Sequence, residues 1–239
     1  MTVTDVNVVK SAIFERPDDA NKGTLGSLLC VCGSYGMAGA AVMSAKGALR
    51  TGIGLAKCAL PRSIYPIVAQ TILESVYYSL NENADGRISK VNVPFLVSES
   101  CKSSATLVGC GLGVCDDTLK IVFSLIENST TPLVLDADAL NCVAKQPEIL
   151  LRKKAPIIIT PHPGEMSRLT GLATPLVNAE RERVALDFAQ KYGVVTVLKG
   201  AGTVIASPNG KVLVNPTGNS GMATGGSGDV LAGMTASIL

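Results

Sequence analysis

The chain has 239 residues, of which 47% are hydrophobic and 17% are charged, and its formal net charge is +2. This composition argues against a disordered chain and supplies enough apolar side chains for one large core. A net charge so close to zero, with no Trp and 4 Phe, also argues against a protein that binds nucleic acid.

Apolar runs of strand length alternate with helical patterns along the chain. In the first half, a helix rich in alanine is predicted at 39–51 and ends at Gly52, and a second helix has Asp116 as its N-cap. In the second half, a helix capped by Asn178 is closed by Gly193. Strands are predicted at 27–32, 55–60, 74–80, 105–109, 132–135, 155–160 and 194–198.

These elements predict an α/β fold, with a central, mainly parallel β-sheet that carries helices on both faces. Strands at 203–206 and 211–214 are expected to add an antiparallel edge hairpin. No linker or change of composition divides the sequence, so residues 1–239 are expected to form a single domain. The last predicted helix, which opens at Gly228 or Asp229, runs to the final residue without a cap, so we expect the C-terminus to be truncated.

The cysteines and the N-terminal segment indicate the compartment. Most of the 7 Cys lie in apolar runs, and none forms a Cys-x-x-Cys pair, so we expect reduced, buried thiols in a cytoplasmic protein. The acidic N-terminal segment (Asp5, Glu15, Asp18 and Asp19) contains no apolar stretch typical of a signal peptide. Two long stretches, 24–45 and 212–228, carry no charge, but glycines interrupt the first and the second is polar and rich in glycine. Neither predicts a membrane span, and we expect no membrane partner.

An uncharged, glycine-rich tract, 215–229, leads into the last predicted helix. Glycines at 225, 226 and 228, together with Ser227, allow backbone N–H groups to turn toward one anion, and the helix N-terminus adds about half a positive charge. This predicts an anion hole for a nucleotide phosphate. No Lys follows the glycines, so the tract is not a Walker A loop.

Asp229 stands at the end of this tract. The helix dipole is expected to hold its carboxylate ionised and to lower its pKa. We predict that Asp229 orients a substrate hydroxyl and accepts its proton. The alternative is an ordinary acid at the start of a helix after a flexible turn.

Four more candidates follow predicted strands, at the edge where ligands bind in open α/β sheets. His162 is the single histidine, and its flanking prolines restrict its backbone. Glu165 is either an acid in a first helical turn or a ligand that reaches Mg²⁺ through water. Asp138 either binds substrate or caps a helix, and Lys199 is either a strand-end cation or a phosphate partner.

Two glycine loops, Gly33–Gly39 and Gly109–Gly113, are weaker signals. Each resembles a dinucleotide fingerprint, but the strand after the first loop ends without the acid that a ribose requires. The second loop has no acid at the expected place either, although Asp136 lies near enough to keep that reading open. Glycines needed only for turns and close helix packing explain these loops equally well.

In combination, six segments resemble one family, the ADP-dependent NAD(P)H-hydrate dehydratases of the ribokinase-like superfamily. The resemblance covers about residues 25–239. The segments are Gly33-Ser-Tyr-Gly-Met-Ala-Gly-Ala40, Gly109-Cys-Gly-Leu-Gly113, Leu135-Asp-Ala-Asp-Ala-Leu-Asn141, Pro161-His-Pro-Gly-Glu165, Leu198-Lys-Gly-Ala-Gly-Thr203 and Asn215-Pro-Thr-Gly-Asn-Ser-Gly-Met-Ala-Thr-Gly-Gly-Ser-Gly-Asp229. The last segment is the most specific, and the His-Pro-Gly-Glu segment separates this branch from the sugar kinases.

The resemblance implies a ribokinase-like fold and a repair reaction, in which hydrated NADH or NADPH (NADHX or NADPHX) is dehydrated through phosphorylation of its ring hydroxyl. It implies Mg²⁺ as cofactor and ADP, or ATP, as co-substrate. Asp229 would be the catalytic residue, with Ala40, Gly113 and His162 around the damaged dinucleotide. The adenine nucleotide would contact Lys199, Gly200, Ala201, Gly202, Thr203 and Gly228.

The resemblance also implies a homo-oligomer, with a tetramer among the expected states, and an NAD(P)HX epimerase as functional partner. The fused epimerase domain usual in the family is absent from this sequence, which suggests a stand-alone form that prefers ADP. His162 replaces the Asn of the ribokinase-type Asn-x-x-Glu segment, a departure that bears on the Mg²⁺ role of Glu165.

Two other functions remain open from the sequence. A small-molecule kinase of the same fold, of the hydroxyethylthiazole kinase type, would share the Gly-Ser-Gly-Asp turn but release a stable phosphorylated product. A nucleotide sensor without catalytic activity would share the turn and not depend on Asp229.

Overall fold

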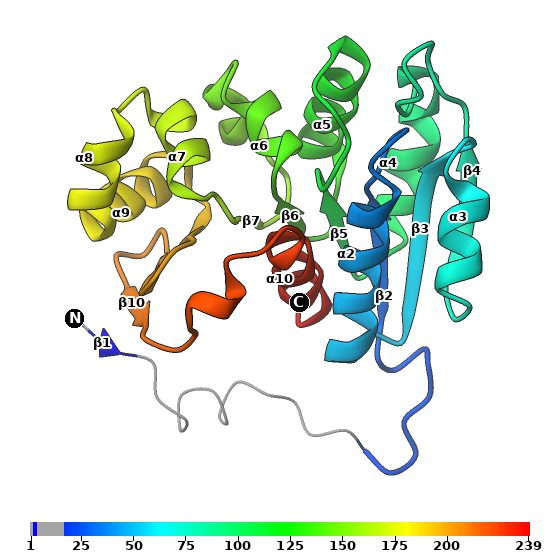
Figure 1. Ribbon diagram of the computed structural model, residues 1–239, viewed down its shortest axis with the longest axis horizontal. Helices are drawn as coiled ribbons and strands as arrows, with labels where there is room; N and C mark the ends of the chain where they lie inside the picture. Colours follow the sequence, from blue (N-terminus) through cyan, green and yellow to red (C-terminus); the bar gives the residue numbers. More distant parts are fainter. Residues whose placement is uncertain (1, 4–16) are drawn as a thin grey trace.

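A computed structural model describes residues 2–3 and 17–239 of the chain. In these residues a ten-stranded sheet runs through the molecule in the order β1-β10-β9-β8-β7-β6-β5-β2-β3-β4 (Figure 1). The strands from β8 to β4 in this order are mutually parallel, whereas β9 pairs antiparallel with both β8 and β10. The predicted fold class, including its antiparallel edge hairpin, is confirmed.

The bounds of β2 to β10 agree with the predicted runs to within two residues at each end, whereas β1 was not predicted. The strands are β1 (Thr2–Val3), β2 (Ser27–Val31), β3 (Leu55–Pro61), β4 (Val76–Leu80), β5 (Ala105–Val108), β6 (Leu133–Leu135), β7 (Ile157–Ile159), β8 (Val195–Leu198), β9 (Thr203–Ala206) and β10 (Val212–Asn215).

Helices connect the strands. Three of them, α3, α4 and α8, were not predicted, and α6 and α7 were expected only as alternatives for Asp138 and Glu165. The helices are α2 (Ala38–Thr51), α3 (Tyr65–Thr71), α4 (Val93–Cys101), α5 (Asp116–Asn128), α6 (Asp138–Val143), α7 (Pro163–Thr170), α8 (Thr174–Ala179), α9 (Arg181–Tyr192) and α10 (Ser227–Ser237), with 3-10 turns η1 (Lys90–Asn92), η2 (Pro147–Arg152) and η3 (Ser220–Met222).

Two predicted helix starts were wrong. Cys115, with extended backbone, is the N-cap of α5, and Asp116 is already helical. Asn178 lies inside the short helix α8, and α9 begins at Arg181 after Glu180. The residues that do stand at the N-caps, Cys115 and Glu180, make no side-chain capping hydrogen bond, so the residue types that favour N-caps indicated the wrong positions.

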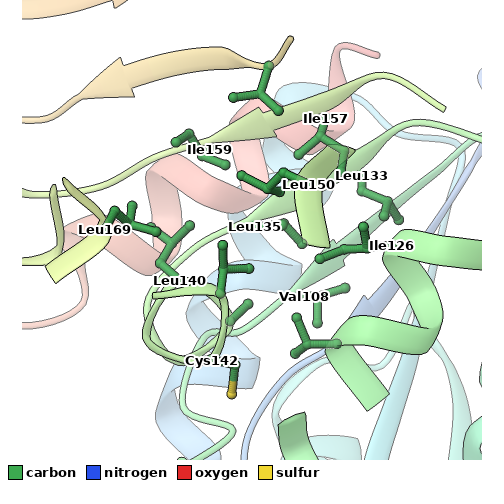
Figure 2. Close-up of a cluster of buried hydrophobic side chains, with 14 of the residues drawn as sticks. Val108, Ile126, Leu133, Leu135, Leu140, Cys142, Leu150, Ile157, Ile159 and Leu169 are labelled. Carbon is green, nitrogen blue, oxygen red and sulfur yellow. The ribbon is translucent and has the colours of Figure 1, made fainter. Parts of the chain in front are cut away.

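The alternation of side chains along each strand builds a core on each face of the sheet. In β2, Leu28 and Cys30 belong to the cluster beneath α2, α3 and α10, while Leu29 and Val31 belong to the larger cluster beneath α4, α5, α6 and α9. Figure 2 shows part of the larger cluster, where aliphatic side chains of β6 and β7 meet those of α5 and α6. Burial on both faces explains why the strands have no polar face.

Helices α2 and α10 pack against each other through small residues. A Cβ at Gly233 would lie 2.0 Å from the backbone oxygen of Ser44, and one at Gly47 would lie 2.6 Å from that of Val230. The buried residues of α10 are Ala232, Gly233 and Ala236, whereas Met234 is 44% exposed. The apolar residues whose spacing predicts this helix, Leu231, Met234 and Ile238, therefore do not form its packed face, because α2 lies too close.

No helix in the described part of the chain is both long and apolar enough to cross a lipid bilayer. Of the acidic N-terminal residues, Asp18 and Asp19 are described and exposed, and Asp5 and Glu15 lie outside the described residues.

Candidate active site

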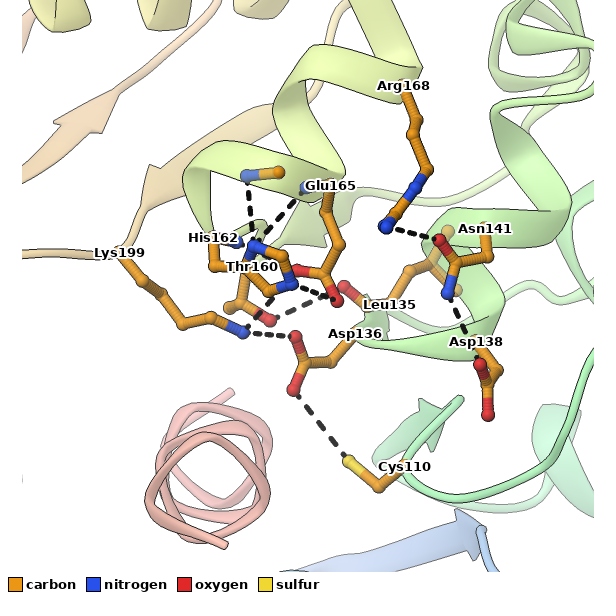
Figure 3. Close-up of polar contacts among 11 residues, drawn as sticks. Cys110, Leu135, Asp136, Asp138, Asn141, Thr160, His162, Glu165, Arg168 and Lys199 are labelled. Carbon is orange, nitrogen blue, oxygen red and sulfur yellow. Dashed lines mark hydrogen bonds and ion pairs between the residues drawn. The ribbon is translucent and has the colours of Figure 1, made fainter. Parts of the chain in front are cut away.

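Adjacent parallel strands bring most of the predicted site residues to one edge of the sheet. The loops that follow β2, β5, β6, β7 and β8 start from neighbouring strands in the sheet order. Figure 3 shows Asp136 after β6, His162 and Glu165 after β7, and Lys199 after β8, with α10 beside them. Residues more than 60 positions apart in sequence thus share one site, since parallel strands place their carboxyl ends together.

A strained turn after β6 separates two carboxylates. Ala137 has φ 50 and ψ −116, and it is the one described residue other than glycine with a positive φ. On one side of it, Asp138 accepts a 2.8 Å hydrogen bond from the Gly113 N–H and a 3.2 Å one from Asn141 Nδ2. Asp138 is thus the first residue of α6 and not its cap, and it ties this helix to the loop after β5.

On the other side of the strained turn, Asp136 forms an ion pair. Its Oδ1 lies 2.6 Å from Lys199 Nζ, which also lies 3.8 Å from Glu165 Oε2. Asp136 is 2% exposed, and the Cys110 thiol points toward its second oxygen at 3.9 Å. From the sequence, Asp136 was considered only as an acid for the loop Gly109–Gly113, because its partner Lys199 is 63 residues away.

The predicted anion hole is the first turn of α10. Gly226 is the N-cap, with φ 90, where an added Cβ would lie 2.0 Å from the Met43 sulfur. At Gly228 an added Cβ would lie 3.6 Å from Lys199 Nζ, whereas at Gly225 it would meet nothing within 4 Å. The ammonium of Lys199 therefore lies beside the helix terminus, and both contribute positive potential there.

Asp229 is half-buried in the same turn, and here the predicted pKa was wrong. The pKa of the Asp229 carboxyl is raised above its ordinary value, chiefly by burial, and Asp136 and Asp138 raise it further. The Cys110 thiol and Lys199 oppose this rise without cancelling it. The sequence showed the helix dipole but not the burial or the neighbouring acids, and the raised pKa makes Asp229 a stronger base.

His162 and Glu165 form a capping box at the start of α7. His162 Nδ1 accepts from the backbone N–H groups of Gly164 (3.0 Å) and Glu165 (3.3 Å), and Glu165 Oε2 accepts from the His162 N–H at 2.8 Å. Pro163 fits the first helical position, where no N–H is needed. Proline followed by glutamate two residues later is the sequence signal by which this helix could have been predicted.

The side chains of Glu165 and His162 differ in how far they are buried. The Glu165 side chain is 6% exposed, and burial raises the pKa of its carboxyl against the opposing charge of Lys199. The His162 side chain is 50% exposed, with Nε2 3.5 Å from Glu165 Oε1. The imidazole is thus anchored at the site edge with one face open to a ligand.

The loop from Lys199 to Thr203 joins β8 to β9 and is supported by a residue that sequence reasoning missed. Arg181, at the start of α9, donates to the Leu198 oxygen at 2.8 Å, and its guanidinium occupies the space beside Gly200. Ala201 and Gly202 line a cavity of about 620 Å³ together with Arg181. No local pattern in the sequence signals Arg181, because its partner is 17 residues away.

The remaining candidates lie nearer β2 and β5. Ala40 is 4% exposed, and its methyl group lies 2.7 Å from where a Cβ on Gly111 would be. The loops after β2 and β5 also bond to each other, since the Gly33 N–H donates to the Cys110 oxygen at 2.7 Å. Ala40 and Gly113 therefore lie in one structural unit, formed by the contacts between α2 and the loops after β2 and β5.

The acids of the site do not fit a directly bound Mg²⁺. Among the described residues no three His, Cys, Asp or Glu side chains group as metal ligands. Lys199 occupies the position between Asp136 and Glu165 that a cation shared by these carboxylates would take. We therefore derive no chemical step through a metal held by these side chains.

The mainly parallel sheet, the glycine turn at the start of the last helix and the acid within that turn define a ribokinase-like protein. A solved ribokinase-like superfamily protein from Enterococcus faecalis superposes with a TM-score of 0.83 at 23% identity, covering 99% of this chain and 78% of that one. At this identity the likeness shows the fold.

The chain belongs to the NAD(P)H-hydrate dehydratase family, whose profile matches residues 28–239. It is 41% identical over 223 residues to a bifunctional NAD(P)H-hydrate repair enzyme from Thermofilum pendens, covering 93% of this chain and 43% of that relative. A Bacillus subtilis ADP/ATP-dependent NAD(P)H-hydrate dehydratase, crystallised with ATP and Mg²⁺, has a TM-score of 0.83 at 31% identity, with 99% and 80% of the two chains covered. The predicted family is confirmed.

Proposed function

We propose that this protein dehydrates NADHX and NADPHX to NADH and NADPH, with ADP as phosphoryl donor. The observation that carries the proposal is the position of Asp229, half-buried in the glycine turn with Lys199 beside it. The carboxylate of Asp229 and the positive potential of Lys199 and the helix terminus lie together. Transfer of a phosphoryl group to an alcohol needs both, a base for the hydroxyl and positive charge for the phosphate.

In this reaction Asp229 accepts the proton of the ring hydroxyl, whose oxygen attacks the terminal phosphorus of ADP. The new O–P bond forms as the phosphoanhydride bond breaks, and AMP leaves. The lone pair of the ring nitrogen then expels phosphate from the adjacent carbon, and loss of a proton from the next carbon restores the ring double bond. The chain supplies position and charge, and phosphate replaces hydroxide as the leaving group.

The remaining site residues take the roles that the family suggests. The nucleotide would lie along the loop from Lys199 to Thr203 and at Gly228, with its terminal phosphate over the turn at 225–228. The dinucleotide would lie between Ala40, Gly113 and His162. Mg²⁺ would then enter as a counter-ion of the nucleotide phosphates, held mainly by phosphate oxygens and water, with Glu165 outside its ligand shell.

We further propose a homo-oligomer in the cytoplasm, working alongside an epimerase activity. The seven cysteines are free thiols, as is usual in reducing compartments. The relative from Thermofilum pendens is named bifunctional, and this chain covers 43% of its length. Apolar side chains on α3 and the loop after it, among them Ile67 (55% exposed) and Leu73 (83% exposed), offer a surface for self-association.

The test is an incubation of the purified protein with NADHX, ADP and Mg²⁺. We expect NADH absorbance to return, with AMP and phosphate released in equal amounts. A stable phosphorylated product in place of NADH would assign the protein to the kinases. Turnover with ATP and none with ADP would contradict the proposed donor.

The variant Asp229→Ala distinguishes the proposed enzyme activity from a nucleotide sensor without catalytic activity. We expect turnover to fall by about 10³-fold or more while the affinity for ADP stays within a few-fold, because the carboxylate acts on the acceptor hydroxyl. Asp187→Asn, on the exposed face of α9, is the matched control and should retain full activity. Unchanged activity in Asp229→Ala would overturn the assignment of this residue.

A further inference from the structure

Asp136 belongs to no predicted contact with substrate or nucleotide, yet the structure constrains it strongly. Its backbone N–H donates to Val108 at 3.1 Å, and its backbone oxygen accepts from Ala139 at 3.1 Å. A Cβ on Gly109 would lie 1.8 Å from that oxygen. The next residue, Ala137, holds φ 50. A strained backbone persists only where the surrounding structure imposes it, and such positions concentrate at functional sites.

Among the residues that the structure describes, Asp136 forms an ion pair with one side chain, that of Lys199. The 2.6 Å contact with Lys199 is buried on the Asp136 side, where 2% is exposed, and more open on the Lys199 side, where 18% is exposed. Glu165 lies farther from the same ammonium, at 3.8 Å, and is already engaged in the capping box. Asp136 therefore supplies the shortest contact that fixes the otherwise flexible end of Lys199.

The fixed ammonium lies beside the glycine turn. The position of a Cβ on Gly228 is 3.6 Å from Lys199 Nζ and 3.9 Å from Asp136 Oδ2. An unpaired carboxylate so close to the turn would repel an anion, whereas the paired ammonium attracts one. A lysine side chain that points elsewhere would leave the negative charge of Asp136 facing the same turn.

We propose that Asp136 is a positioning residue for phosphoryl transfer, which holds the Lys199 ammonium against the turn where the transferred phosphate lies. The inference deepens the proposed function and rests on it for the identity of the phosphate. The contact of Lys199 with that phosphate strengthens as charge develops in the transition state. Loss of Asp136 should therefore lower kcat more than it changes the KM for NADHX.

Asp136 also acts on Asp229 through space. The groups that face Asp229 are Cys110 after β5, Asp136 and Asp138 around the turn after β6, and Lys199 after β8. Replacing Asp136 by asparagine removes a negative neighbour of Asp229, while the positive charge of Lys199, although no longer held at one point, remains after β8. The acidic limb of the kcat/KM profile, which reports the ionisation of Asp229, should then move to lower pH.

The experiment compares Asp136→Asn, Lys199→Met and the double variant, with Asp187→Asn as the control for an Asp-to-Asn change outside the site. We expect Asp136→Asn to lower kcat by about 10- to 100-fold and Lys199→Met by about 100-fold or more. Because Asp136 acts through Lys199, the double variant should be no slower than Lys199→Met. The double variant also removes both buried charges, so it folds even where Asp136→Asn alone leaves an unpaired ammonium.

The positioning role would be overturned if the losses of kcat in the two single variants multiply in the double variant. It would also be overturned if the acidic limb of the kcat/KM profile of Asp136→Asn stays at the wild-type pH. Binding of ADP, measured by calorimetry, separates this failure from failure of the proposed function. We expect Asp136→Asn to weaken ADP binding by about 3- to 10-fold, as a misplaced Lys199 requires. If that loss occurs while the wild-type protein leaves NADHX unchanged, the positioning role stands and the dehydratase proposal fails.

Discussion

Replacing Gly233 by alanine tests the close approach of the helix that carries Asp229 to its neighbour. The added Cβ would lie 2.0 Å from the Ser44 oxygen, and contacts below 3.0 Å do not occur, so α10 must move away from α2 by about 1 Å. Overpacking against backbone costs about 3 kcal/mol at the upper end of the usual range, and the better helix propensity of alanine returns about 1 kcal/mol. We expect a net loss of about 2 kcal/mol.

Thermal unfolding measures this loss. For a chain of this size, about 2 kcal/mol corresponds to a decrease in Tm of about 4 to 8 °C. Gly39→Ala is the matched control for stability, since it is an exposed helical glycine whose added Cβ would meet only Met43, at 4.0 Å. A displacement of about 1 Å at Asp229 should also lower kcat by about 100-fold. A Gly233→Ala protein as stable and active as the wild type would refute the packing argument.

Three more outcomes follow from the site. Glu165→Ala should reduce the free energy of unfolding by about 1–2 kcal/mol, because the His162 N–H loses its acceptor. Glu165→Gln keeps that hydrogen bond, so equal losses of the two variants in denaturant titrations would contradict the capping role. Ala137→Gly should raise stability by about 1 kcal/mol, since glycine tolerates φ 50, and a lower Tm would argue against strain there. The raised pKa of Asp229 predicts that, as the pH is lowered, kcat/KM begins to fall at a pH above the ordinary carboxyl pKa of 3.8, because protonation removes the base. A kcat/KM profile that stays flat down to pH 3.8 would exclude the raised pKa.

The succession of strands and helices along the chain, and the edge of the sheet where the site forms, could be predicted from the sequence, whereas the order of the strands in the sheet could not. Apolar runs, glycine stops and the hairpin turn are local signals, and a parallel sheet follows from their alternation. The glycine turn before Asp229 was recognisable because the residue types that shape an anion hole are adjacent in the chain. Helices α3, α4 and α8 escaped prediction because each is short and lacks a strong apolar period.

The sequence by itself determined which residues could do the chemistry, since glycine is defined by the absence of a side chain and aspartate and lysine by the charge of theirs. Only the tertiary structure decided how they act together. The Lys199–Asp136 ion pair, the support of the Lys199 loop by Arg181 and the raised pKa of Asp229 all depend on contacts between distant segments. Burial and electrostatic potential are sums over neighbours in space, so they exist only once the chain has folded.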